Sequence, residues 1–131
     1  METETTSTSP QLREGQIFAR ESYGNTLVLK PLIQLGSLHE PEIVHETEDL
    51  LDVLIHSPSA NLVIDLERGD YLGTAMLGAF VKLWKRVSQR GGRLALCNVS
   101  ENVEEVLRIT KLQTVWPIYG TRDQALAAIG V

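Results

Sequence analysis

The chain has 131 residues, which suits one domain built around one core. Its formal net charge of -5 argues against a protein that binds nucleic acid, because no overall excess of Lys and Arg exists to neutralise phosphates. No apolar run approaches the roughly 20 residues that a helix needs to cross a bilayer. We therefore expect no membrane contact and a cytoplasmic location.

The N-terminal segment has the composition of an unfolded tail. Residues 1–13 are rich in Thr, Ser and Glu, which bury too little apolar surface to offset the entropy of ordering. The segment also lacks the basic start and the apolar centre of a secretory signal. We expect a flexible tail over residues 1–13 and one folded domain over residues 14–131.

The first folded elements are predicted to be a β-hairpin and a helix. Gln16–Arg20 and Thr26–Ile33 are β-prone runs, and the Gly-Asn pair between them is a turn signal. From Pro41 to about Ser57, apolar residues recur at helical spacing. The core face of this helix is expected to contain Ile43, Val44, Leu50, Leu51, Leu54 and Ile55, with Glu42, Glu46, Glu48 and Asp52 elsewhere.

Strands and helices alternate through the rest of the chain. The apolar run Asn61–Leu66 predicts a strand that is buried on both faces. We then expect a helix over about Ala75–Arg90, a strand over Leu94–Asn98, a helix capped by Ser100, a strand over Val115–Tyr119 interrupted by Pro117, and a last helix opened by the capping box Thr121–Gln124. This order predicts an α/β fold with a largely parallel sheet and right-handed crossovers.

The residues that could carry chemistry do not form a metal site. His45 and His56 are 11 residues apart, which is too far for two ligands of one metal at helical spacing, and no Cys cluster accompanies them. Cys97 is the only cysteine and lies in an apolar segment, so we expect it to pack as a small hydrophobe. No metal or cofactor is expected.

A cluster of carboxylates follows the strand at Asn61–Leu66. Asp65, Glu67 and Asp70 could hold a cation or act as acid and base at the C-terminal end of a parallel strand. We favour structural roles, in which Asp65 binds nearby backbone amides and Asp70 is a turn residue. No matching nucleophile or phosphate loop accompanies them, so we do not expect an enzyme.

Thr74 stands where this turn meets the next helix. A phosphate added to its hydroxyl would be favoured by the free backbone N–H groups and by the helix dipole. The alternative is structural, because Thr is a favoured N-cap and capping alone would explain the residue. A regulated binding surface is therefore a more natural interpretation than an active site.

Several short motifs in the chain, taken as a set, point to one family. They are Asp65-Leu66, Asp70-Tyr71-Leu72, Leu77-Gly78-Ala79, Arg90–Leu96, Asn98-Val99-Ser100, Val106–Leu112 and Pro117-Ile118-Tyr119. Taken jointly they resemble the STAS domain family, of the anti-sigma factor antagonist type, most clearly between Asn61 and Ile129. The resemblance implies a SpoIIAA-like STAS fold, in which a mixed, mostly parallel sheet of four to five strands carries an N-terminal hairpin and about four helices.

The resemblance also implies a function. Proteins of this kind capture an anti-sigma factor that is also a serine kinase of the GHKL type, and phosphorylation of the turn hydroxyl ends the capture. Thr74 aligns with the phosphoacceptor. Where the family carries Asp-Ser-Ser-Gly, this chain carries Gly73-Thr74-Ala75-Met76, so the carboxylate before the acceptor is absent.

The candidate partner-binding surface combines two loops that follow the C-terminal ends of neighbouring predicted strands. It consists of Asp70, Tyr71, Leu72, Gly73, Thr74, Ala75, Met76, Val99, Ser100 and Asn102. The expected partner is an anti-sigma factor with kinase activity or another STAS protein, and a homodimer is a further expectation.

Two alternative functions stay open from the sequence. One is a STAS scaffold or stressosome-like interaction module that is not phosphorylated, in which Thr74 serves only as a cap. The other, ranked last, is a small-ligand sensor or enzyme that uses the acidic turn. That function needs a concave pocket near Asp65 and Asp70 with convergent polar groups.

Overall fold

A five-stranded sheet forms the centre of the protein. The computed structural model describes residues 17–32, 40–56, 60–67 and 72–129. Within these residues the strands are β1 (Phe18–Tyr23), β2 (Thr26–Pro31), β3 (Asn61–Asp65), β4 (Leu94–Cys97) and β5 (Ile118–Tyr119), in the spatial order β1-β2-β3-β4-β5. The β1–β2 pair is antiparallel and the other neighbours are parallel, which confirms the predicted α/β fold with an N-terminal hairpin.

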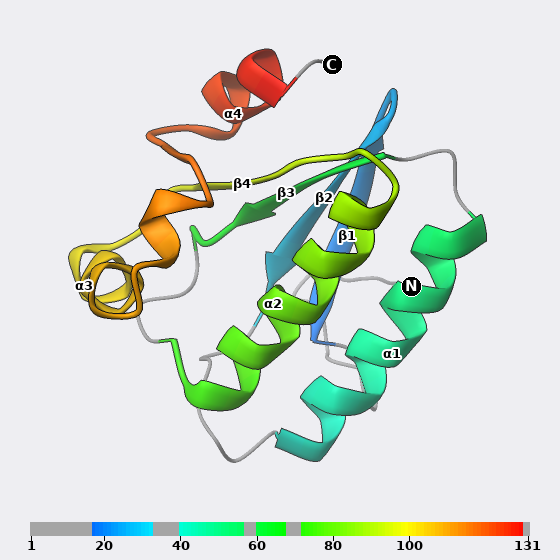
Figure 1. Ribbon diagram of the computed structural model, residues 1–131, viewed down its shortest axis with the longest axis horizontal. Coiled ribbons are helices and arrows are strands. Elements are labelled where there is room, and N and C mark those ends of the chain that lie inside the picture. The colour runs from blue at the N-terminus through cyan, green and yellow to red at the C-terminus, as the bar shows by residue number, and fades with distance from the viewer. Residues whose placement is uncertain (1–16, 33–39, 57–59, 68–71, 130–131) are drawn as a thin grey trace, which may run out of the picture.

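The helices cover the two faces of the sheet unequally. They are α1 (Glu40–His56), α2 (Thr74–Gln89), α3 (Glu101–Ile109), a short 3-10 helix η3 (Leu112–Thr114) and α4 (Arg122–Ile129). Figure 1 shows α1 and α2 side by side on one face and α4 on the opposite face. Among the described segments, none of the helices combines the length and the apolarity that a membrane span requires.

The apolar core divides in the same way. The larger cluster lies on the side of α1, α2 and α3 and includes the fully buried Phe80 and Trp116. The smaller cluster lies under α4, where Val63, Ala95 and Cys97 of the sheet meet Ala125, Leu126 and Ile129. The sheet therefore has one thickly covered face and one face that α4 covers mainly over β3, β4 and β5.

Local signals in the sequence fix the ends of several elements. Ser100 caps α3, because its side chain accepts a hydrogen bond from the Val103 N–H at 3.2 Å. The capping box also forms, since the Gln124 N–H donates to the Thr121 hydroxyl at 3.1 Å and the Gln124 side chain accepts from the Thr121 N–H at 3.3 Å. Both predicted helix starts are confirmed.

The Gly91-Gly92 pair ends α2 for two separate reasons. Gly91 adopts a left-handed φ of 81°, which glycine tolerates without strain. A Cβ on Gly92 would lie 1.5 Å from the Ala60 carbonyl oxygen, so no side chain fits there. The turn after α2 therefore requires glycine at both positions.

The predicted strand Val115–Tyr119 is wrong over its first half. The N–H groups of Val115 and Trp116 both donate to the Leu112 carbonyl, at 3.0 and 2.9 Å, in the turn that continues η3. Pro117 has no N–H to give to a sheet. Only Ile118 and Tyr119 pair with β4, while the Trp116 side chain packs in the core.

The predicted core face of α1 is also partly wrong. Val44 and Ile55 are 40% and 46% exposed, whereas Glu46 is only 4% exposed. The Glu46 carboxylate accepts hydrogen bonds from the backbone N–H groups of Ile17 and Phe18, the second at 3.0 Å. A buried carboxylate thus satisfies the donors at the start of the edge strand β1.

We predict that Glu46→Ala lowers the free energy of unfolding by roughly 2–4 kcal/mol, because it leaves two buried N–H groups without an acceptor. Glu42→Ala is the matched control, since Glu42 is exposed on the same helix. Urea denaturation followed by circular dichroism measures both variants. Equal stabilities for the two variants would show that Glu46 does not hold β1.

Candidate functional site

Thr74 is the first residue of α2, and it is exposed. The N-cap is Gly73, with φ -84° and ψ 170°, and no side chain caps this end of the helix. The interpretation of Thr74 as the N-cap is therefore wrong by one residue. The first turn of α2 also contains no acidic residue, so no carboxylate of the helix itself offsets the positive end of its dipole.

The predicted partner-binding residues differ in how accessible they are. Thr74 and Asn102 are exposed, while Ala75, Val99 and Ser100 are half-buried. Leu72, Gly73 and Met76 are buried, with Met76 only 1% exposed, so these residues support the turn from inside. Asp70 and Tyr71 lie outside the described residues.

A buried carboxylate joins the starts of the two candidate loops. Asp65, the last residue of β3, is 1% exposed. Its side chain accepts hydrogen bonds from the Glu67 N–H at 3.0 Å and from the Asn98 side-chain amide at 2.9 Å. The predicted bond from Asp65 to a nearby backbone amide is confirmed, and the carboxylate in addition holds the exit of β4.

Arg122, which lies 57 positions after Asp65 in the sequence, supplies the positive charge that pairs with it. Its Nε donates to Asp65 at 3.0 Å, and its Nη1 contacts the Glu21 carboxylate and, at 3.2 Å, the Tyr23 hydroxyl. Burial opposes the charge, but the hydrogen bonds to Tyr23, Asp65 and Glu21 outweigh it and raise the pKa of the guanidinium. One side chain at the start of α4 thus connects the sheet's centre to β1.

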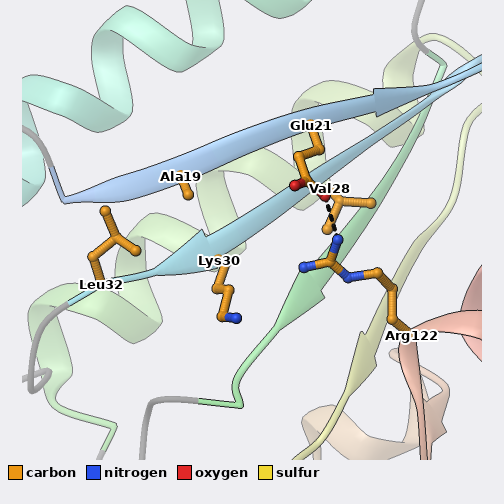
Figure 2. A pocket seen from close by; sticks show the side chains of 6 residues that line it. All are labelled: Ala19, Glu21, Val28, Lys30, Leu32 and Arg122. Carbon is orange, nitrogen blue, oxygen red and sulfur yellow. Dashed lines mark hydrogen bonds and ion pairs between the residues drawn. The ribbon is translucent and has the colours of Figure 1, made fainter. Parts of the chain in front are cut away.

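A cavity of about 200 Å³ lies beside this arginine, on the face of the sheet that α4 leaves open. Figure 2 shows its lining, which consists of Ala19, Glu21, Val28, Lys30, Leu32 and Arg122. Each charged side chain in the lining already has a partner, because Lys30 pairs with Glu67 at 2.7 Å and Arg122 pairs with Glu21 and Asp65. Asp65 does not line this cavity, so the cavity is not the pocket around Asp65 and Asp70 that a ligand sensor or enzyme needs.

Cys97 packs as predicted. It is fully buried at the end of β4, within the cluster under α4. Burial, with the nearby Asp65 charge, raises the pKa of the Cys97 thiol to about 12. The thiol is therefore neutral at physiological pH. No group of three or more metal-ligating side chains occurs in the described ranges.

Sequence reasoning missed the roles of Asn98 and Arg122. Asn98 adopts a left-handed φ of 56°, and in this conformation its side-chain amide donates a hydrogen bond to Asp65. In the sequence, Arg122 is only a member of the capping box, because its partner Asp65 is 57 positions away. The only sequence signal is the cluster of carboxylates itself, because a carboxylate that becomes buried needs donors or a cation nearby.

Comparisons with known proteins agree on one family. The family model for the STAS domain matches residues 15–125. The anti-sigma F factor antagonist of Paenibacillus polymyxa is 25% identical over 95 residues, which cover 69% of this chain and 81% of that protein.

Solved structures show the same fold. An anti-sigma-factor antagonist (STAS) domain protein from Planctomyces limnophilus superposes with a TM-score of 0.69 and 25% identity, over 86% of this chain and 97% of that chain. The anti-sigma factor antagonist SpoIIAA in its unphosphorylated form gives a TM-score of 0.73 with 16% identity, over 86% and 95%. The Bacillus SpoIIAA in the phosphorylated form gives 0.69 with 15% identity, over 86% and 99%.

We predict that Arg122→Ala lowers the free energy of unfolding by about 2–3 kcal/mol, since it leaves the buried Asp65 carboxylate without its cationic partner. The effect stays below that of a fully buried pair because Arg122 retains some contact with water. Glu21→Ala should cost much less, because Glu21 is exposed and its removal leaves the pair with Asp65 intact. Chemical denaturation compares the two variants, and an equal loss in both would refute the central role of Asp65.

Proposed function

Because the chain belongs to the STAS domain family, we propose that it is an anti-sigma factor antagonist that works by binding an anti-sigma factor and so frees a sigma factor. The match over residues 15–125, together with the likeness to the Paenibacillus polymyxa antagonist, carries this proposal. The role requires a docking surface and no catalytic group, and the family is regulatory. We place the interaction in the cytoplasm, where sigma factors act.

Thr74 is proposed as the residue that switches binding. Its exposure and its position at the uncapped start of α2 support this role. A phosphate on the hydroxyl would add about -1.5 to -2 charges to an end of the helix that attracts anions. A partner that fits the uncharged surface would then meet a desolvation cost and, where it is acidic, repulsion.

The proposed partner is a serine kinase of the GHKL type that is also the anti-sigma factor. Gly73 has no side chain that could orient the acceptor hydroxyl, so on this proposal the kinase positions Thr74 through its own groups. The contact surface would consist of Thr74 and Asn102 at its centre, with Ala75, Val99 and Ser100 around them. Leu72 and Met76 keep the backbone of the turn in place without contacting the partner.

A second candidate function is an interaction module that is not phosphorylated, with other STAS proteins as its partners. The absence of a carboxylate at Gly73 favours this alternative, because the family carries Asp before its acceptor. Under it, the same surface docks a partner, but the state of the Thr74 hydroxyl does not control the affinity.

We predict that Thr74→Glu weakens partner capture at least about tenfold, while Thr74→Val, which keeps the shape and loses the hydroxyl, has little effect. Gln89→Glu is the charge control, because Gln89 is exposed at the other end of α2, about 22 Å away by the helical rise. The test is capture from a lysate of the source organism, followed by mass spectrometry of the captured proteins and of Thr74.

The outcomes separate the two functions. Capture of a kinase-like protein, with phosphate on Thr74 in a fraction of the chains, would support the switch. Capture of STAS proteins alone, with equal binding by the Glu and Val variants, would reject the switch and support the unphosphorylated module.

A further inference from the structure

Helices α1 and α2 pack against each other, and we call the outer surface along their seam the valley. The two helices begin at the same end of the molecule and run side by side, as Figure 1 shows. Near their starts a small hollow lies between them, lined by Ile43, Val44, Thr47, Ala75, Ala79 and Lys82. Val44, which lines the hollow, is an exposed apolar residue of α1, as are Val53 and Ile55 further along the helix.

The two walls of the valley have opposite charges. Helix α2 contains no acidic residue, and its outer face presents Lys82, Lys85 and Arg86. The outer face of α1 presents Glu48 and Asp52. Within the described part of the chain, no ion pair joins these acids to these cations. A chain with a net charge of -5 therefore concentrates unpaired positive charge on one helix.

The opposite charges lie at matching heights. Glu48 and Lys82 each come eight residues after the first residue of their helix, and Asp52 and Arg86 each come twelve residues after it. At the helical rise these positions lie about 12 and 18 Å along the two axes. A second copy that laid its α1 parallel to this α2 would bring both pairs together.

The shapes also match at the start of the valley. Val44 and Gly78 each come four residues after the first residue of their helix. Val44 is 40% exposed, and Gly78 is exposed with nothing within 4 Å of where a Cβ would stand. The Val44 side chain of a second copy can therefore rest over Gly78, where the two backbones approach closely.

We propose that the valley is the contact surface of a homodimer, in which α1 of one copy packs on α2 of the other. The two-fold axis runs parallel to the helices, so each contact occurs twice. An axis across the helices would instead place α1 on α1 and oppose acid with acid. A second copy fits better than an unrelated acidic partner, because such a partner would meet Glu48 and Asp52 with like charge. The proposal does not depend on phosphorylation of Thr74 or on an anti-sigma factor.

The test is a charge swap on the purified full chain, measured by analytical ultracentrifugation across protein concentration at low salt. Lys82→Glu alone and Glu48→Lys alone should each raise the dimer dissociation constant at least about tenfold, because each homodimer then contains two like-charge contacts. A 1:1 mixture of the two variants should restore dimers, since a heterodimer contains only attractive pairs. Lys111→Glu and Glu105→Lys, exposed elsewhere, are the charge-matched controls and should behave as the wild type.

Four results would overturn the proposal. The first three are a wild-type chain that stays monomeric up to millimolar concentration, a dimer that both reversals leave intact, and reversals that dissociate the dimer without rescue by mixing. A fall in melting temperature without any change in mass would show that Lys82 only pairs with α1 of its own copy, and this outcome also refutes the proposal.

Cross-linking gives an independent measurement. A chain with Val44→Cys mixed with a chain with Gly78→Cys should form a disulfide between copies under mild oxidation. Cys97 does not interfere, because it is fully buried. Equal cross-linking by an exposed control pair, Glu105→Cys with Lys111→Cys, would mean that the contact is not specific and would contradict the assigned surface.

Discussion

The Asp65 carboxylate lies inside the protein, where an unpaired charge would be costly, and donors from three separate segments meet on it. The Glu67 N–H starts the connection to α2, the Asn98 amide starts the connection to α3, and the Arg122 guanidinium belongs to α4. Each donor ties the start of its segment to the same carboxylate. Because Arg122 also contacts Glu21 and Tyr23, the same set of bonds reaches the hairpin. The exits of β3 and β4, which lead to the two candidate loops, are therefore held together by this one side chain.

Strand ends that are held together in this way suit a protein that binds a partner through the loops that follow them. Thr74 stands at the exposed start of α2, while Leu72 and Met76 anchor the chain around it in the core. The side chain proposed as the switch therefore stands at the start of a helix whose neighbouring residues are anchored in the core, and a change of its charge would alter the surface. The valley between α1 and α2 begins at the same end, since Ala75 lines the hollow there. Partner binding at Thr74 and self-association along the valley would then occupy adjoining parts of one face.

Much of this architecture follows from local sequence. The turn at Gly24-Asn25, the Ser100 cap, the capping box at Thr121 and the alternation of strands with helices depend on neighbouring residues, so sequence patterns reveal them. Three features depend on distant partners and could not be predicted. Glu46 is buried because β1, 28 positions earlier, needs an acceptor. Trp116 is not part of a strand, because its side chain packs in the core and its N–H bonds to the last turn of η3. Arg122 contacts Asp65 only because the fold brings the two residues together. The position of Thr74 at a helix start was predictable, whereas its exposure and the Gly73 cap required the structure.

Hydrogen exchange of Asp65→Asn, read at individual amides by NMR, tests the central role of the buried carboxylate most directly. The substitution keeps the size of the side chain and removes the charge that Arg122 neutralises. We expect faster exchange at Glu67, at the residues 98–103 and at the start of α4, with the middle of α1 unchanged. Exchange that stays slow at all of these amides would contradict the account, because the loops would then be held without Asp65.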